Sequence, residues 1–270
     1  AMNRKIIKIS PFVLAAVAAS FSTQTYSSGF ALIENSASGQ GNAFAGAAAY
    51  AEDASTVWFN PAGMMKLDTK QILVAGHYIT PSSSFTNGNS VDGLGVPLSG
   101  DNDDGGIDAF VANFYWVTDI REDMKFGLGV TTPFGLTTLY DDSWVGRYHA
   151  VESDLKTINI NPSIAYQVNE KFSVGGGINL MLADVTLTSA IDFGAVCYAA
   201  LNQATCDAQG ALPQQTDGFG DLTGDNFSDL SWGLNLGLMY DFTPETRVGV
   251  AWRSETKVKA KGDAKFTVPA

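Results

Sequence analysis

Long segments in which apolar and polar residues alternate constrain this chain more than any other feature. Between 157 and 168, for example, Ile158, Ile164 and Val168 fall on one face, and Asn159 and Ser163 fall on the other. A period of two is the pattern of a β-strand with two different faces. Segments of this kind recur at 71–80, 107–118, 124–132, 157–168, 172–182, 230–242 and 247–259.

The lengths of these segments and of their connections favour a membrane barrel over a soluble all-β domain. They run about 10 to 14 residues, which exceeds the 5–6 residues usual in globular proteins and suits a tilted membrane strand. Short turns at 118–123, 168–171 and 242–246 alternate with long loops at 81–106, 133–153 and 187–228. Outer-membrane barrels have this alternation. The sequence therefore predicts an all-β fold, a transmembrane antiparallel β-barrel, with a soluble all-β domain as the alternative.

The odd number of segments indicates an incomplete barrel. Single-chain bacterial barrels have even strand numbers, and an open edge in lipid leaves backbone groups without hydrogen-bond partners. The sequence ends at Ala270 without a further aromatic strand. We expect 70–270 to be the first half of a barrel whose C-terminal strands are missing. Assembly of several chains into one barrel is the alternative.

The N-terminus has the order of a secretory signal. Basic residues in 2–8 precede the apolar run 11–19, and Thr25 and Ser27 suit the small-residue rule for cleavage. The run is too short for a spanning helix, which needs about 20 residues. The sequence predicts a cleaved signal peptide at 2–27 and location in the bacterial outer membrane, and a buried helix is the alternative.

Charge and cysteine content narrow the possible partners. The formal net charge of −12 argues against nucleic acid, because few cations would neutralise phosphates. Cys197 and Cys206 predict a loop disulfide in an oxidising compartment. A metal pair is the alternative, but it needs two more ligands, and neither His77 nor His149 lies nearby in sequence. The acidic run 101–105 lacks the downstream glutamate of a calcium loop. We expect no metal and no cofactor.

Residues 28–69 fit neither the signal nor a strand. They are rich in Gly and Ala, and 43–51 are mostly small residues. Asn60 followed by Pro61 initiates a turn and places Pro61 at a first helical position. Small residues suit a segment packed inside a narrow lumen, so we expect a compact N-terminal segment there.

Two groups of sequence blocks resemble one known family. The blocks are 29–36, 39–46 and 52–64 in the N-terminal segment, and 132–135, 144–150 and 154–163 further on. They are similar to the FadL/TodX-type outer-membrane transporters, which import long-chain fatty acids and aromatic hydrocarbons. The likeness runs from residue 29 to the end of the chain, with 81–106 and 187–228 unmatched in detail.

This resemblance implies a fourteen-stranded barrel closed by an N-terminal hatch, here residues 28–69. The hatch includes the turn formed by Asn60, Pro61 and Ala62. The resemblance also implies that the tail around Phe30 and Leu32 reaches into an apolar binding pocket.

A further implication is an inward kink in the third strand, through which ligand leaves sideways into the bilayer. The third strand here is 124–132, with Gly127 and Gly129 on its lumen face and Pro133 at its end. Gly inside a strand marks bends or close approach. The sequence does not fix the position of the kink.

Together these features predict a passive outer-membrane channel that captures hydrophobic compounds, above all long-chain fatty acids, and releases them laterally. Arg147 is the candidate partner for a fatty-acid carboxylate, and pairing with loop acids such as Asp141, Asp142 or Glu152 is the alternative. Neutral aromatic hydrocarbons are the alternative cargo. A general porin, which should lack a plug, is an alternative class, as is an adhesin or structural barrel.

The expected partners are hydrophobic small molecules and outer-membrane lipid, and the full-length protein is expected to be a monomer. No phosphate-binding Gly loop followed by Lys and Ser or Thr is present, so no energy source is expected. His77 and His149 have no recognisable serine and acid partners, and the chain is not expected to be an enzyme.

Overall fold

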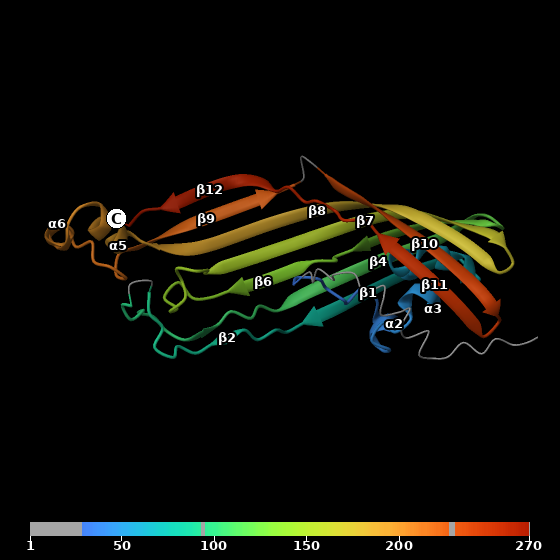
Figure 1. Ribbon diagram of the computed structural model, residues 1–270, viewed down its shortest axis with the longest axis horizontal. Helices are drawn as coiled ribbons and strands as arrows, with labels where there is room; N and C mark the ends of the chain where they lie inside the picture. The colour runs from blue at the N-terminus through green and yellow to red at the C-terminus, as the bar shows by residue number, and fades with distance from the viewer. Residues whose placement is uncertain (1–28, 93–94, 227–229, 270) are drawn as a thin grey trace, which may run out of the picture. The chain divides into compact units, whose positions relative to one another are not determined.

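The computed structural model describes residues 29–92, 95–226 and 230–269, so the predicted signal peptide at 2–27 lies outside the described residues. The chain divides into two compact units, residues 1–31 and 32–270. Of the first unit only residues 29–31 are described. The second unit contains every helix and strand of the described residues (Figure 1).

Seven antiparallel strands, which we call the wall, follow one another in chain order across the main sheet. They are β1 (Gln71–Ile79), β4 (Ala109–Arg121), β5 (Met124–Thr131), β7 (Glu152–Asn169), β8 (Phe172–Asp192), β10 (Ser231–Thr243) and β11 (Thr246–Arg253). Each overlaps with one of the alternating segments, so the prediction of an antiparallel β-fold is confirmed. Within the described residues β1 and β11 do not pair with each other, and the wall is open between them.

Parts of the connections also form strands. The short pair β2 (Ser84–Phe85) and β3 (Asp103–Asp104) lies between β1 and β4, and β6 (Gly135–Leu139) pairs with β7. The expectation of a long loop at 187–228 is wrong. There β8 continues to Asp192, α5 (Phe193–Ala200) and α6 (Gln203–Ala208) follow, and β9 (Asp217–Asp225) pairs with the end of β8.

The last predicted strand also differs from the structure. The expected strand 247–259 ends at Arg253, and β12 (Lys261–Thr267) pairs with β9 instead of continuing the wall. The residues of β9 are mostly Gly, Asp and Thr, so no apolar alternation marks this strand in the sequence. The residues of β9 are strand because they pair with β8 on one side and with β12 on the other.

The wall is apolar on its outer face and polar on its inner face. In β10, Trp232 is 65% exposed on one face, whereas Asn235 is 2% exposed on the other. Outward residues of β1 and β4 such as Val74 and Phe110 are also exposed, and the inward Asn113 is buried. A soluble sandwich shows the opposite arrangement, because its large apolar side chains face its core. The arrangement matches a wall that faces lipid.

Helices do not supply a membrane span. Within the described residues, no helix combines the length and the apolar character needed to cross a bilayer.

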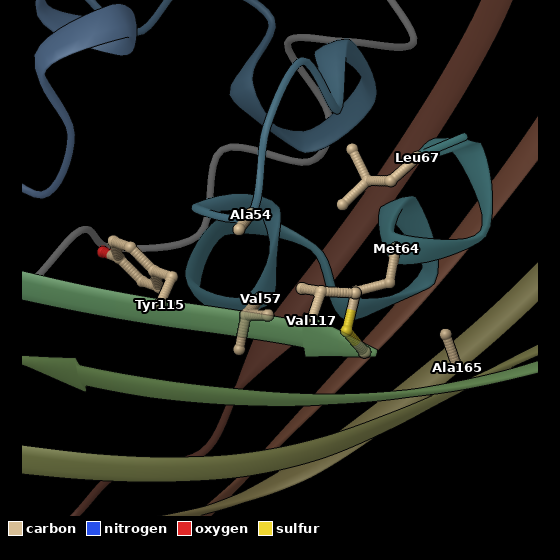
Figure 2. Close-up of a cluster of buried hydrophobic side chains, with 7 residues drawn as sticks. All are labelled: Ala54, Val57, Met64, Leu67, Tyr115, Val117 and Ala165. Carbon is tan, nitrogen blue, oxygen red and sulfur yellow. The ribbon is translucent and has the colours of Figure 1, made fainter. Parts of the chain in front are cut away.

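The segment predicted to form the hatch, for which we keep that name, consists of short helices packed on the inner face of the wall. They are α2 (Ala37–Gln40), α3 (Ala47–Tyr50), α4 (Thr56–Phe59) and the 3-10 helix η1 (Pro61–Lys66). The helix η1 contacts β5, β7, β8 and β10, and α3 contacts β11. In Figure 2, Val57 and Met64 of the hatch lie against Tyr115 and Val117 of β4, and these side chains form a buried apolar cluster with Ala54, Leu67 and Ala165.

Candidate functional site

The turn formed by Asn60, Pro61 and Ala62 fastens the hatch to the wall. The Asn60 side chain is fully buried, and its Nδ2 donates to the carbonyls of Ala48 at 2.6 Å and Leu238 at 3.1 Å. Its Oδ1 accepts from the amide of Ala62 at 3.1 Å and so caps η1, whose first residue is Pro61. One side chain therefore holds the turn, a second hatch helix and β10 together.

Two wall glycines make the close approach of this turn possible. A Cβ at Gly237 would lie 1.9 Å from Asn60 Oδ1, and a Cβ at Gly175 would lie 2.5 Å from the backbone nitrogen of Ala62. Both distances are far below van der Waals contact. Any larger residue at either position must therefore move the hatch or the strand.

Polar side chains of the wall also donate to backbone carbonyls of the hatch. The hydroxyl of Tyr115 donates to the carbonyl of Asn35 at 2.7 Å, and Lys125 Nζ donates to that of Leu67 at 2.6 Å. Asn35 precedes α2 and Leu67 follows η1, so these two carbonyls lie outside the hydrogen bonding within the helices. The inner face of the wall supplies partners for these, so the hatch depends on the wall for its own structure.

The wall is interrupted beside β4. The ladder between β4 and β5 begins at Phe114, so residues 109–113 pair with β1 but not with β5. The third strand resumes after the interruption as β6, which pairs with β7. Contact with the segment before β4 returns only at the bridge between Gly106 and Thr138. A gap therefore separates 107–113 from 132–137.

An extra residue lies beside this gap, in the pairing of the third strand with β7. Thr131 pairs with Asn159, and the next pair along the same two strands is Gly135 with Lys156. Residues 132–134 thus lie opposite only 157–158, which is the unequal count of a β-bulge. The middle residue of the three is Pro133, which has no backbone N–H for a ladder.

A cavity of about 400 Å³ occupies the gap. It is lined by Leu32, Ile79, Pro81, Ile107, Ala109, Phe110, Val111, Thr132, Gly135, Leu136, Thr137, Leu155, Lys156, Thr157 and Ile158. Val111 and Thr157 are buried on the inner face of the wall, whereas Phe110 and Ile158 are exposed on its outer face. The cavity therefore contacts side chains of both faces of the wall. The only charged residue in this lining is Lys156, whose Nζ lies 2.5 Å from Asp154.

Leu32, a predicted pocket residue, lies in this cavity. Its backbone N–H donates to the carbonyl of Pro133 at 2.9 Å. A Cβ at Gly135 would lie 3.1 Å from its Cδ1. Contact between Leu32 and ligand stays a prediction, as does the role of Phe30, which belongs to the first unit.

The three residues predicted for the lateral opening lie in different settings. Pro133 lies in the interruption itself. Gly127 and Gly129 lie in the regularly paired part of β5, and Gly127 leaves room for Val57 and Met64 of the hatch. The interruption therefore falls at 132–134, a position that the sequence left open.

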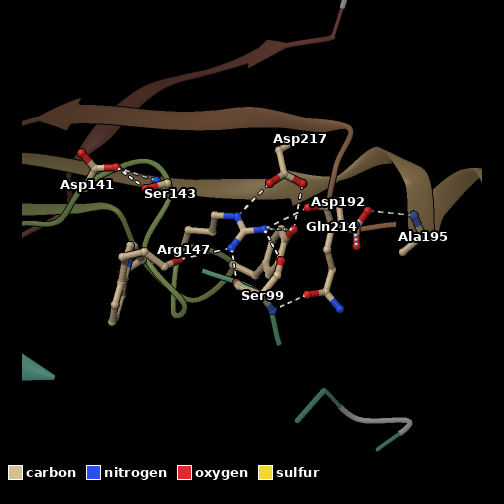
Figure 3. Close-up of polar contacts among 11 residues, drawn as sticks. Ser99, Asp141, Ser143, Arg147, Asp192, Ala195, Gln214 and Asp217 are labelled. Atoms are coloured by element: carbon tan, nitrogen blue, oxygen red, sulfur yellow. Dashed lines mark hydrogen bonds and ion pairs between the residues drawn. The ribbon is translucent and has the colours of Figure 1, made fainter. Parts of the chain in front are cut away.

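Arg147 is buried in a clamp between loops (Figure 3). Its Nε lies 2.8 Å from the carboxylate of Asp217, and one terminal nitrogen donates to the carbonyl of Ser99 at 2.7 Å. The other terminal nitrogen donates to the hydroxyl of Tyr148 at 2.8 Å and to the carbonyl of Gln214 at 3.3 Å. The acid partner is thus Asp217 and not Asp141, Asp142 or Glu152.

The clamp also holds Tyr148. Its hydroxyl donates to Asp217 at 2.8 Å. The pKa of Tyr148 is raised above its usual value, mainly because the hydroxyl is partly buried and secondly because it donates this hydrogen bond. The guanidinium of Arg147 is occupied by protein acceptors, so a ligand carboxylate must displace Asp217 to reach it. Carboxylate capture by Arg147 stays a prediction with that added condition.

The remaining predicted positions lie at the loop end of the sheet. Cys197 in α5 and Cys206 in α6 are joined by a disulfide, with their Cα atoms 6.0 Å apart. In the acidic run, Asp104 accepts hydrogen bonds from the hydroxyls of Ser82 and Ser84 at 2.7 Å. Within the described residues, no group of three or more His, Cys, Asp or Glu side chains has a metal-binding arrangement.

Sequence reasoning missed most of the cavity lining, including Val111, Leu136 and Thr157. Alternation places each of these residues on a strand or beside one. It does not show between which two neighbouring strands the pairing is interrupted. The available signal was Pro133, since a proline inside a sheet marks an edge or a bulge.

The described residues thus form a section of antiparallel barrel wall that is apolar outside, carries the short helices of residues 37–66 on its inner face and has an interruption of strand pairing with a cavity on one side. Residues 18–269 match the family described as "Outer membrane protein transport protein (OMPP1/FadL/TodX)". The chain belongs to this family.

Its similarity to curated relatives extends over nearly the whole chain. The long-chain fatty acid transport protein of Escherichia coli K12 is 31% identical over 257 residues, which cover 93% of this chain and 56% of that protein. Outer membrane protein P1 of Haemophilus influenzae is 32% identical over 253 residues, covering 85% and 54% respectively. The chain therefore spans about half the length of the curated relatives it matches.

Solved structures show the same fold. A Pseudomonas aeruginosa FadL homologue matches with a TM-score of 0.76 at 22% identity, covering 89% of this chain and 56% of that one. The Ralstonia pickettii toluene transporter TbuX matches with a TM-score of 0.54 at 21% identity, covering 82% and 57%.

Proposed function

We propose that this chain forms the hatch and part of the wall of a channel for passive uptake of hydrophobic compounds across the bacterial outer membrane. The cargo is captured in the cavity beside Leu32 and leaves sideways through the interruption at 132–134. The observation that carries this proposal is the mostly apolar cavity that contacts both faces of the wall.

The free energy of capture comes from burial of apolar surface. Each methylene group that leaves water contributes roughly 0.8 kcal/mol, so affinity rises with chain length. Release requires a change in the shape of the cavity. The hydrogen bond from Leu32 to Pro133 supports a coupling between the tail and the opening, because movement of either affects the other.

Long-chain fatty acids are the cargo we propose first. The curated relatives from Escherichia coli and Salmonella typhi are named long-chain fatty acid transport proteins. Neutral aromatic hydrocarbons are the second candidate. They are favoured by the lining, whose single cation is already paired, and by the fold shared with a toluene transporter.

A bulky residue in the gap tests the lateral route. Ala109 lines the cavity on the inner side of β4, whereas Ala112 on the same strand is exposed on the outer face. In the full-length protein, Ala109→Trp should abolish most uptake of labelled oleate by cells, because the indole fills the opening. Ala112→Trp adds the same group toward lipid and should leave uptake unchanged. Equal uptake by both variants would refute the lateral route.

A further inference from the structure

A second arginine, Arg253, lies against the hatch and has no acid partner among the residues that the structure describes. Its guanidinium stacks on the ring of Trp58, 3.4 Å from the ring centroid, and its Nη2 donates to the carbonyl of the same residue at 2.7 Å. Its Nε is buried and has no hydrogen-bond acceptor among the described residues. Stacking fixes the plane of the guanidinium, so the edge that carries Nε is held in one orientation.

Asn235, the residue that pairs with Arg253 on the neighbouring strand, has a second donor without an acceptor in the described part of the chain. Asn235 of β10 pairs with Arg253 of β11, and its side chain is 2% exposed. Its Oδ1 accepts from Asn161 at 2.9 Å and from Asn179 at 3.2 Å, which fixes the orientation of the amide. Its Nδ2 is buried without an acceptor in the described part of the chain. Buried donors normally have partners, and leaving one unpaired costs about 1–3 kcal/mol.

Both residues line one cavity of about 220 Å³ beside the hatch. Trp58, Phe59 and Pro61 form its hatch side. The cavity is separate from the one at the interruption and shares no lining residue with it.

We propose that Arg253 and Asn235 form a binding site for a carboxylate, which serves as a second station for the head group of a fatty-acid cargo at the hatch. This inference rests on the proposed uptake function and specifies its cargo. The carboxylate accepts one hydrogen bond from Arg253 Nε and one from Asn235 Nδ2, and its chain lies along the aromatic side chains of the hatch.

The donors favour a singly charged carboxylate over a more highly charged anion. One guanidinium balances one negative charge, and two donors match the two oxygens of a carboxylate. A phosphate offers more charge and more acceptors than these two residues satisfy. An acid from another part of the full-length protein has the same chemistry as a free fatty acid, so the experiment must separate these two sources.

Equilibrium binding of palmitate and of hexadecanol to the purified full-length protein, in a neutral maltoside detergent, makes that separation. Arg253→Gln should weaken palmitate binding roughly tenfold or more, because a charge-assisted hydrogen bond is lost. Hexadecanol has no carboxylate, and its binding should be unchanged. Arg121→Gln removes the same charge from the exposed end of β4, where Arg121 pairs with Asp123, and should affect neither ligand.

Asn235→Asp tests the site without removing the arginine. The variant keeps the oxygen that accepts from Asn161 and Asn179, but it replaces the unused donor with an acid next to Arg253. Palmitate affinity should fall as in Arg253→Gln, with hexadecanol again unchanged. Arg253→Lys, which keeps the charge, should recover part of the palmitate affinity.

The outcomes are distinct. Unchanged palmitate binding in both Arg253→Gln and Asn235→Asp overturns the inference, and it is the result expected if a protein acid fills the site. Equal weakening of both ligands overturns it as well, since the two residues would then only support the structure. If Arg253→Gln does not fold, as judged by heat-modifiable gel migration, Asn235→Asp decides alone. Failure of the wild-type protein to bind either ligand would instead refute the proposed uptake function.

Discussion

Two neighbouring parts of the wall are built from the same kind of alternating strand but behave differently. The ladder of β7 and β8 keeps one register from the pair Glu152 and Thr188 to the pair Gln167 and Ser173. The ladder of β4 and β5 stops at Phe114, and the third strand continues only after the interruption. The first part, which we call the closed side, is continuously in register, and the second, which we call the open side, contains an interruption of the pairing.

The difference depends on few residues. On the closed side, Asn161 and Asn179 both donate to Asn235, so buried amides join β7, β8 and β10 across the inner face. On the open side, the third strand has one extra residue and one proline at 132–134 in its pairing with β7, beside the place where its pairing with β4 stops. The pairing of a barrel wall can thus be interrupted next to a local bulge, while the strands on either side remain regular.

The largest expected effect comes from disturbing the contact between the hatch and the closed side. Gly175→Ala places a Cβ 2.5 Å from the backbone of Ala62 and should destabilise the protein by about 1–3 kcal/mol through overpacking. The displaced hatch should raise the conductance of single channels in planar bilayers. Gly220→Ala is the control, because the nearest atoms to its Cβ are side-chain atoms at 3.4 Å. Equal conductance in the two variants would contradict the role of Gly175 as a seat for the hatch.

The closed side was the easier part to predict from sequence. Alternation depends on which face of a strand meets lipid, so it identified all seven wall strands. It failed for β9, where residues such as Gly218, Gly220 and Asp221 carry no apolar row and pairing depends on β8. Alternation also failed to find the gap at 109–113. It shows which face of one strand is apolar, but it does not show whether that strand pairs with its neighbour.

The candidate site was predictable only where a residue has a local chemical signature. Asn60 and Pro61 have one, since an Asn cap before a first-turn proline defines a helix start. Arg147 and Arg253 are both arginines, and no local sequence pattern tells their roles apart. Only the fold shows that Arg147 meets Asp217 and that Arg253 has no acid partner among the described residues.

A smaller loss of stability should follow from breaking the ion pair of Arg147 and Asp217, which joins loops from both parts of the wall. Ser99 and Arg147 belong to loops that flank the open side, and Asp217 begins β9 on the closed side. Asp217→Asn should lower the free energy of unfolding by about 1.5 kcal/mol, because Arg147 loses a charged partner that is itself 20% exposed. The measurement is amide hydrogen exchange in the loop around Arg147. Asp123→Asn breaks an exposed pair and should cost less than about 1 kcal/mol. Equal protection of these amides from exchange in the two variants would show that the ion pair of Arg147 and Asp217 does not stabilise the loop.

The smallest effect is a pH dependence in the loop on the open side. Hydrogen bonds from the hydroxyls of Ser82 and Ser84, then from backbone amides, hold the pKa of Asp104 below its usual value. A lowered pKa in the folded state stabilises the loop above the unfolded value of about 3.9, and the stabilisation is lost as the pH falls through the folded value. Protection factors of the amides of Ser83 and Gly106, measured by NMR, should therefore hold from pH 7 to about 4 and fall below it. A loss of protection at higher pH would contradict this.

Deletion of Phe134 tests the lateral route. The deletion leaves two residues opposite 157–158, so the third strand should pair with β7 in one register from β5 into β6 and lose the bulge that lies beside the gap. Deletion of Gly88, which lies in the loop between β1 and β4, serves as the control. The measurement is oleate uptake by cells that express the full-length variants, together with a structure that confirms the continuous strand. We expect the Phe134 deletion to abolish uptake and the Gly88 deletion to preserve it. Normal uptake through a continuous strand would contradict the lateral route.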